Sequence, residues 1–358
     1  MKPLHGITIL EFSTMITASF AAMMLAEQGA RVIKVEPTDM GDPMRFIGSM
    51  KGGISALFAN CNRGKESIRV DLKSEEGQAL IKDMASQADI VIHNFRPGVM
   101  DSINLGSEAL RAANPKLIYM AISGFGGVGP LGDAPAYDPI IQAQSGFTAT
   151  QTKEQPEFVR NLMCDKITAY TACQAVTTAL YVREKTGEGQ HIDLSMMDAG
   201  LFFVFPDGFM HHTLLDDDVW HMPPLYEMLY DLTLTKDGAI TMSAATERQR
   251  TNLLVAIDRV ELMADERFNT QEKLLANLAE FREEMQGVHA DLRNLGGRWG
   301  GANTAAAFLS NFVGRVRRWA HIDIAGTAYE ASREAKTSEA TGFGVSLAVD
   351  WLLSRTER

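Results

Sequence analysis

Short β-rich runs alternate with helical patterns over the first 130 residues of the 358-residue chain, and this alternation constrains the fold more than any other feature. The expected strands are 7–12, 31–37, 67–72, 89–95 and 117–126, and the expected helices are 18–29, 74–87 and 107–114. Strands that alternate with helices predict an α/β fold with a doubly wound, mainly parallel sheet. We therefore expect functional residues in the loops that follow the strands.

The loop after the first expected strand lacks the GxGxxG pattern that lets a dinucleotide pyrophosphate approach a helix start. Glu36, after the second strand, imitates the acidic ribose ligand of a dehydrogenase, but one acidic residue is a weak signal. The pattern therefore disfavours a nicotinamide enzyme.

The early loops instead carry spaced positive charge. These residues are Arg45, Arg63, Lys65, Lys73 and Arg96. Arginine donates paired hydrogen bonds to phosphate, whereas most charged side chains are simply solvated. The pattern alone leaves both interpretations open.

The formal net charge of −11 argues against a general surface for nucleic acid or anionic membranes and favours small ligands. The three cysteines form no paired or metal-like spacing, which is typical of a reducing cytosol. Because no apolar run reaches about 18 residues, we expect a cytoplasmic protein with neither nucleic-acid nor membrane partners. His211 and His212, with His221, offer no fixed geometry for a metal ion, and we expect no metal.

A lone acid, Asp165, precedes a helical stripe of small residues. The stripe consists of Ala169, Ala172, Cys173, Val176, Ala179 and Leu180. Asp165 is therefore expected at or just before a helix start. One interpretation is a helix cap, because aspartate there accepts hydrogen bonds from free N–H groups. The other is a reactive carboxylate that the helix dipole keeps ionised.

Five long segments occur together in a fixed order. They are "AEQGARVIKVEPTDMGDPMR", "NRGKESIRVDLKSEEG", "NFRPGVM", "SGFGGVGPLGDAPAYDPIIQAQSGF" and "REKTGEGQHIDLSMMDA". In this order and spacing the chain resembles the family III (CaiB/BaiF-type) CoA-transferases, whose superfamily includes the 2-methylacyl-CoA racemases. The resemblance runs from about residue 3 to 210 and more loosely to about 286.

The resemblance implies that Asp165 is the catalytic nucleophile, which attacks an acyl-CoA and carries CoA as an aspartyl thioester. It also implies a second site residue, Tyr137, and CoA as a substrate with no metal. The implied CoA-binding residues are Arg45, Lys73, Asn94, Arg96, Gly124, Gly126 and Gly127. Acyl-CoA and carboxylic acids are the expected partners, and the protein is expected to form a homodimer.

Racemisation is the competing chemistry within the superfamily, and it needs two acid/base groups around an α-carbon. Racemases typically place a histidine where this chain has Tyr137. Because the tyrosine pKa is about 10, Tyr137 is a poor proton acceptor at neutral pH. The substitution favours the transferase, although Tyr137 is also interpretable as a wedge in a proline-rich loop.

The expected organisation is a CoA-binding domain at 1–210, a partial smaller α+β domain at 211–287 and a foreign α/β tail at 288–358. Residues 289–358 resemble the C-terminal end of leucyl (cytosol) aminopeptidases. Since the metal-binding segments of that family are absent, we expect no peptidase activity. A catalytically inactive, CoA-binding hybrid chain is therefore a third functional hypothesis.

One cluster of methionine and phenylalanine has two interpretations. It consists of Met196, Met197, Phe202, Phe203 and Phe205. Such residues line an apolar acyl pocket in some proteins, but at this spacing they more commonly form plain core. We therefore expect core.

Overall fold

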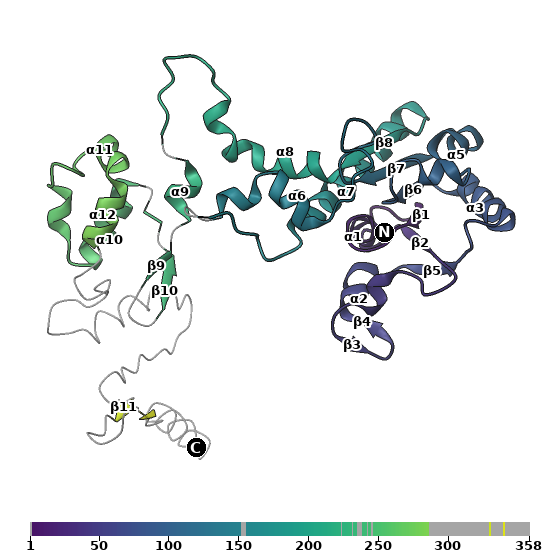
Figure 1. Cartoon of the computed structure of the whole chain (residues 1–358), viewed down its shortest axis with the longest axis horizontal. Coiled ribbons are helices and arrows are strands. Elements are labelled where there is room, and N and C mark those ends of the chain that lie inside the picture. Colours follow the sequence, from purple (N-terminus) through teal and green to yellow (C-terminus); the bar gives the residue numbers. More distant parts are fainter. Residues whose placement is uncertain are drawn as a thin grey trace. The chain divides into compact units, whose positions relative to one another are not determined.

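The computed structural model describes residues 2–151, 155–222, 224–230, 232–234, 238–241, 243–244 and 246–285, together with two short strands, β11 (Tyr329–Glu330) and β12 (Glu339–Ala340). The chain divides into two compact units, Met1–Glu227 and Met228–Arg358. Figure 1 shows the elements of both units.

A six-stranded parallel sheet forms the centre of the first unit (Figure 1). Its strands are β1 (Thr8–Phe12), β2 (Arg31–Glu36), β5 (Glu66–Arg69), β6 (Ile90–His93), β7 (Ile118–Ser123) and β8 (His191–Ser195). They lie in the order β5-β2-β1-β6-β7-β8, and every neighbouring pair is parallel. The order reverses between β1 and β6, where open α/β sheets bind their ligands. The prediction of a doubly wound parallel sheet is confirmed.

Helices cover both faces of this sheet. On one face lie α1 (Thr17–Glu27) and α7 (Met163–Thr186), and on the other lie α3 (Glu75–Gln87) and α5 (Ser107–Ala113). Alanines such as Ala21 and Ala172 let α1 and α7 pack closely against each other. Ile81 of α3 and Leu110 of α5 pack in the core of the opposite face. Side chains alternate between the two faces along a strand, and β1, β2, β6 and β7 each contribute to both cores.

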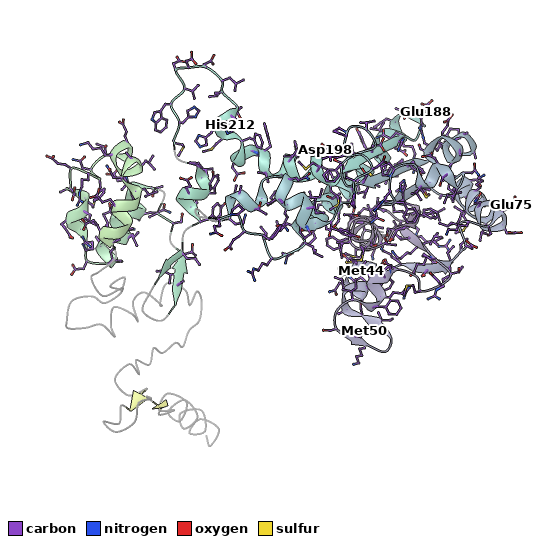
Figure 2. All side chains as sticks on the ribbon, viewed as in Figure 1. Met44, Met50, Glu75, Glu188, Asp198 and His212 are labelled. Carbon is purple, nitrogen blue, oxygen red and sulfur yellow. The ribbon has the colours of Figure 1, made fainter. Side chains whose placement is uncertain are left out.

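The remaining elements up to residue 229 are η1 (Pro43–Phe46), β3 (Met50–Lys51), β4 (Ile54–Ser55), α2 (Ala56–Asn62), α4 (Val99–Ser102), α6 (Asp138–Gln144), η2 (Phe147–Thr150), α8 (Met196–Gly208), η3 (Met210–His212) and α9 (Leu225–Leu229). Met44 in η1 is fully buried, whereas Met50 in the β3–β4 hairpin is exposed (Figure 2). Met44, Phe58 and Ile16 belong to one small core. This core attaches η1 and α2 to the loop that follows β1.

The second unit contains β9 (Leu232–Leu234), β10 (Ala239–Thr241), α10 (Glu247–Ala256), η4 (Val260–Met263), α11 (Gln271–Ala276) and α12 (Leu278–Met285). β9 and β10 are antiparallel. Leu254, Phe268 and Phe281 belong to the core of the helices.

The aminopeptidase-like tail expected at 289–358 lies outside the described residues, apart from the antiparallel pair β11 and β12. In the part of the chain that the structure describes, no helix combines the length and the apolar character needed to cross a membrane.

Candidate active site

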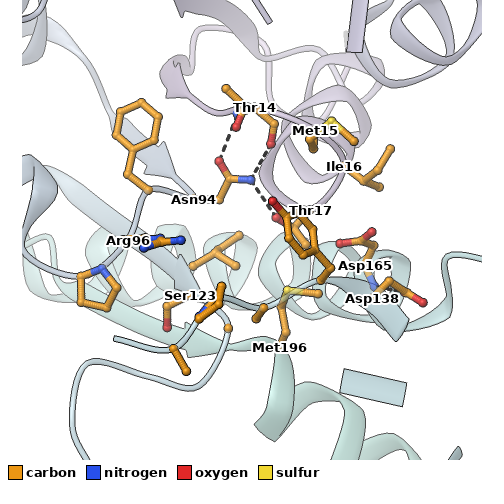
Figure 3. A pocket seen from close by; sticks show the side chains of 18 of the residues that line it. Thr14, Met15, Ile16, Thr17, Asn94, Arg96, Ser123, Asp138, Asp165 and Met196 are labelled. Atoms are coloured by element: carbon orange, nitrogen blue, oxygen red, sulfur yellow. Dashed lines mark hydrogen bonds between the residues drawn. The ribbon is translucent and has the colours of Figure 1, made fainter. Parts of the chain in front are cut away.

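A cavity of about 380 Å³ opens beside the carboxyl ends of β1 and β6, where the strand order reverses. Its walls are Thr14–Thr17 after β1, Asn94–Pro97 after β6, residues 122–124 of β7 and its following loop, Gly132, residues 134–139, Leu162 and Asp165 at the start of α7, and Met196 at the start of α8. Figure 3 shows these side chains converging on one space. The fold therefore brings Asp165 to the place where a sheet of this kind binds ligands.

Asp165 is the third residue of α7, which begins at Met163. The N-cap residue is Leu162, and it makes no side-chain capping bond, so the interpretation of Asp165 as the helix cap is wrong. Burial, followed by the charge of Asp138, raises the pKa of Asp165 to about 7, and Lys166 opposes this shift. The helix dipole is worth about 1 kcal/mol or less, so the effect of burial on this carboxylate is the larger one.

Asp138 also lines the cavity, and the sequence analysis did not include it among the candidate site residues. It is the first residue of α6 and is almost fully buried, and its Oδ2 accepts a hydrogen bond from the backbone N–H of Asp165 at 3.0 Å. Its Oδ1 accepts a hydrogen bond from Gln142 Nε2, and that amide also donates to the backbone oxygens of Val159 and Asn161. Asp138 therefore fixes the start of α7. The only signal in the sequence was its place beside Tyr137 and before a proline, which is typical of a helix start.

Tyr137 directly precedes α6 and lines the cavity with a side chain that is 70% exposed. Gly124 lines the same cavity, and a Cβ there would lie 2.2 Å from the Cβ of Ala136. Gly126 has a φ of +88°, which favours glycine, and Gly127 lines a separate neighbouring cavity. Tyr137 and Gly124 thus line the same cavity, whereas Gly126 and Gly127 lie in the loop beyond it and do not.

Asn94 ties the ends of β1 and β6 together. Its Oδ1 accepts a hydrogen bond from the Thr14 N–H at 3.1 Å, and its Nδ2 donates to the Thr14 oxygen at 2.7 Å and to Thr17 Oγ1 at 3.1 Å (Figure 3). Arg96 also lines the cavity and is exposed. Asn94 therefore supports the wall of the site, and Arg96 offers a charge at its surface.

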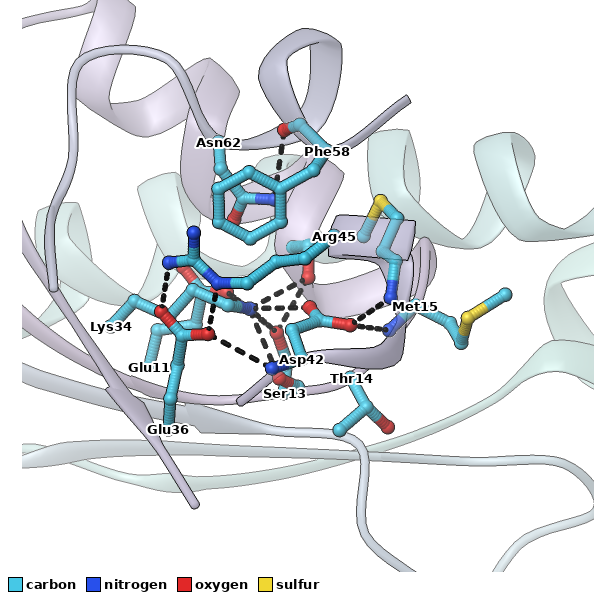
Figure 4. Close-up of polar contacts among 12 residues, drawn as sticks. Glu11, Ser13, Thr14, Met15, Lys34, Glu36, Asp42, Arg45, Phe58 and Asn62 are labelled. Carbon is cyan, nitrogen blue, oxygen red and sulfur yellow. Dashed lines mark hydrogen bonds and ion pairs between the residues drawn. The ribbon is translucent and has the colours of Figure 1, made fainter. Parts of the chain in front are cut away.

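Arg45 and Lys73 do not line this cavity. The Arg45 guanidinium donates to both oxygens of Glu36, at 2.7 and 2.5 Å, and lies 3.9 Å from the centre of the Phe58 ring (Figure 4). Burial opposes ionisation of Glu36, but the bonds from Arg45 and Ser67 lower its pKa to about 2. The guanidinium of Arg45 is thus already hydrogen-bonded to a carboxylate at two of its nitrogens. Lys73, in contrast, is exposed and lies just before α3.

A buried charge network lies beneath the loop after β1 (Figure 4). Glu11 forms ion pairs with Lys34 at 2.8 Å and with Lys65 at 2.7 Å, and Lys34 also pairs with Asp42 at 3.0 Å. All four side chains are at most 2% exposed, and two cations balance two anions. Lys65, suggested by the sequence as one of the phosphate-binding cations, is therefore committed to Glu11. Charged residues inside the β1 and β2 runs were the sequence signal for this network.

Asp42 connects this network to the cavity wall. Its Oδ1 accepts hydrogen bonds from the N–H groups of Met15, at 3.2 Å, and Met44, at 2.9 Å. Met15 has a φ of +62°, a left-handed conformation that is uncommon outside glycine. The buried Asp42 carboxylate thus holds a strained residue of the cavity wall in place.

The cluster on α8 differs from the expected core. Met196 is buried and lines the cavity, but Phe202 is 80% exposed, and Phe203 and Phe205 are also exposed. None of the three phenylalanines lines the cavity. The core prediction is wrong for them, although the ring of Phe203 stacks on the ring of Phe147 in η2.

His211 and His221 lie close, with 3.4 Å between their Nδ1 atoms. Among the described residues, no three histidine, cysteine or acidic side chains converge as a metal site.

The sequence profile of CoA-transferase family III matches residues 4–295. The chain is 34% identical to the acetyl-CoA:oxalate CoA-transferase of Acetobacter aceti over 285 residues, which cover 77% of this chain and 72% of the relative. It is 33% identical over 292 residues to the succinate–glutarate CoA-transferase of Agrobacterium fabrum, covering 78% of this chain and 73% of the relative.

The chain is also similar to solved structures of CoA-transferase-like proteins. The crystal structure of Rv3272 from Mycobacterium tuberculosis, a protein named as a probable fatty acyl-CoA transferase, superposes with a TM-score of 0.71 at 32% identity, covering 79% of this chain and 77% of that one. A CaiB/BaiF family protein from Brucella suis superposes with a TM-score of 0.69 at 29% identity, covering 87% of this chain and 82% of that one.

Proposed function

The chain belongs to CoA-transferase family III, and from that premise we propose that it transfers CoA from an acyl-CoA to a carboxylic acid through covalent intermediates on Asp165. The observation that carries the proposal is the position of Asp165. Its half-buried carboxylate lies at the start of α7 and lines the cavity beside β1 and β6, where the strand order of the sheet reverses.

The first half of the reaction has two acyl transfers. A carboxylate oxygen of Asp165 attacks the thioester carbonyl, and the C–S bond breaks to give a mixed anhydride and CoA thiolate. The thiolate then attacks the aspartyl carbonyl, and the anhydride C–O bond breaks to give an aspartyl-CoA thioester and the free donor acid. The acceptor carboxylate repeats both steps in reverse and regenerates the Asp165 carboxylate, so no proton is consumed overall.

The environment of Asp165 suits a nucleophile. With a pKa of about 7, a substantial fraction of the side chain is ionised at neutral pH. A carboxylate that has lost part of its water shell attacks a carbonyl more readily than a solvated one. Asp138 fixes the helix start that carries it.

The cavity suggests how CoA lies. Arg96 is the exposed cation of the lining and suits a phosphate, and Gly124 and Tyr137 line the same cavity as Asp165. Lys73 is exposed and open to a second phosphate contact. We assign no phosphate to Arg45, because Glu36 occupies both ends of its guanidinium.

The test is to trap the covalent intermediate. Purified protein is incubated with a panel of acyl-CoAs, treated with hydroxylamine or borohydride, and analysed by intact-mass measurement and peptide mapping. We expect a hydroxamate or a reduction product at Asp165, and none in Asp165→Asn. Asp83→Asn, an exposed acid of α3, is the matched control and should behave as the wild type.

Bound CoA without an adduct at Asp165 would contradict the proposed mechanism. Exchange of the α-proton of the acyl group with deuterated solvent would then identify the racemase, and its absence would identify the inactive hybrid.

A further inference from the structure

A second cavity, of about 410 Å³, adjoins the one that contains Asp165. The two cavities share two lining residues, Ile16 after β1 and Leu162 before α7. Ile16 and Leu162 therefore form the partition between them. A ligand whose reacting group lies at Asp165 reaches the second cavity if the rest of the molecule extends past Ile16 and Leu162.

The interior of the second cavity is largely apolar. Besides Ile16 and Leu162, its walls include Phe20 of α1 and Leu57 of α2. Such a lining suits the hydrocarbon part of an acyl group. Polar groups lie among the remaining lining residues, and two of these carry positive charge.

The two cations, Arg63 and Lys166, differ in what they already bind. Arg63 forms an ion pair with Glu27 at 2.6 Å. Lys166 donates to the neutral amide oxygen of Asn161, and within the described part of the chain no carboxylate lies within ion-pair distance of its ammonium. Lys166 is therefore the cation of this cavity that is available to an anion.

Lys166 directly follows Asp165 on α7, so one turn of helix presents a nucleophile to the first cavity and an ammonium to the second. Leu162, one turn earlier on the Lys166 face, lies between the two cavities. An acid with a carboxylate at each end of a short hydrocarbon chain matches this arrangement. One carboxylate reacts at Asp165, the chain crosses Ile16 and Leu162, and the other carboxylate meets Lys166.

We propose that the second cavity is the acyl subsite of this chain and that Lys166 selects short dicarboxylic acids over monocarboxylic acids of equal length. The inference rests on the function proposed above and narrows it, since the relatives are named for substrates as different as oxalate, glutarate and fatty acyl groups. A simple fatty acid would leave the Lys166 ammonium without an anionic partner in a largely apolar space.

The experiment compares glutarate with valerate, which have equal length and differ by one carboxylate. CoA exchange from succinyl-CoA to each acid is measured for wild type, Lys166→Met and Lys166→Arg, with Lys185→Met in the last turn of α7 as the control. We expect the ratio of kcat/KM for glutarate over valerate to fall at least tenfold in Lys166→Met, to recover in Lys166→Arg and to stay constant in Lys185→Met. The ratio of the two kcat/KM values is compared because Lys166 also lowers the pKa of Asp165. Loss of that effect changes the rates with glutarate and valerate equally, so it cancels in the ratio.

A wild-type ratio near one, or an equal loss for both acids in Lys166→Met, would overturn the proposal. Calorimetric titration of glutarate into the free protein separates this inference from the proposed function. Binding that Lys166→Met weakens, without exchange to any acid, would support the subsite and refute the transferase mechanism. If glutarate neither binds nor reacts, while valerate accepts CoA, the transferase stands and the subsite assignment is wrong.

Discussion

The carboxylate of Asp138 lies directly beneath the backbone of Asp165, with 3.0 Å between Oδ2 of the first residue and the amide nitrogen of the second. This one contact joins two elements, because Asp138 begins α6 and Asp165 lies in the first turn of α7. It places an anion beside a second carboxylate, which raises the pKa of that carboxylate. Asp138 therefore both positions the proposed nucleophile and limits its ionisation.

The pH profile of exchange should report this relationship. Asp138→Asn keeps an oxygen that accepts the Asp165 N–H but removes the negative charge, so the pKa of Asp165 falls from its value of about 7. The nucleophile must be ionised, and the acidic limb of the kcat/KM profile should therefore move to lower pH. Burial, the larger cause of the raised pKa, remains, so the limb should stay above the ordinary range of an aspartate. A limb that stays in place, or that moves to higher pH, would show that Asp138 does not act through charge.

Stability should depend on the charge of Asp165 in the opposite sense to most acids. Its folded pKa of about 7 lies above the ordinary 3.8, so the folded state holds more protons between these values and its stability falls as pH rises through them. Asp165→Asn removes this loss. We expect the variant to be more stable than the wild type at pH 8, by at most about 4 kcal/mol, with the difference disappearing near pH 4. Urea unfolding at both pH values measures it, and a constant difference would contradict the assignment.

The buried network predicts a large loss of stability when one cation is removed. In Lys65→Met the two carboxylates Glu11 and Asp42 share Lys34 alone, and one negative charge stays buried without compensation. Breaking a buried pair in this way costs about 3–5 kcal/mol. Chemical denaturation of Lys65→Met should show a loss of that order, whereas Lys82→Met, at an exposed site on α3, should stay within about 0.5 kcal/mol. A small loss for Lys65→Met would mean that water reaches the network.

Strand and helix periodicity was sufficient to predict the class of the fold, a mainly parallel sheet with helices, but not the order of the strands. The runs that contain β1, β2, β6 and β7 are strongly apolar and are separated by helices, and such local patterns carry the fold class. α2, α6 and α8 were not expected. Each is short or has an exposed apolar face, so packing and capping decide its boundaries more than its own periodicity does.

The site was only partly predictable, for a different physical reason. Asp165 and Tyr137 were visible through the family resemblance, and both line the cavity. The pairing of Asp138 with Asp165, and of Arg45 with Glu36, joins residues from separate elements whose distances depend on tertiary packing. The spaced series of cations therefore left open whether it binds phosphate or is simply solvated, and two of its members neutralise buried acids.

The contact between Gly124 and Ala136 gives a last prediction, about the wall of the site. A Cβ on Gly124 would lie 2.2 Å from the Cβ of Ala136, so Gly124→Ala must displace the segment that carries Tyr137 and Asp138. Overpacking of this kind costs about 1–3 kcal/mol, and we expect thermal unfolding to show that loss together with reduced exchange activity. The matched control is Gly127→Ala, where nothing lies within 4 Å of the new Cβ and stability should hardly change. The double variant Gly124→Ala/Ala136→Gly restores the space and should recover most of the stability. If it does not, the loss in the single variant comes from the backbone of Gly124 and not from the clash.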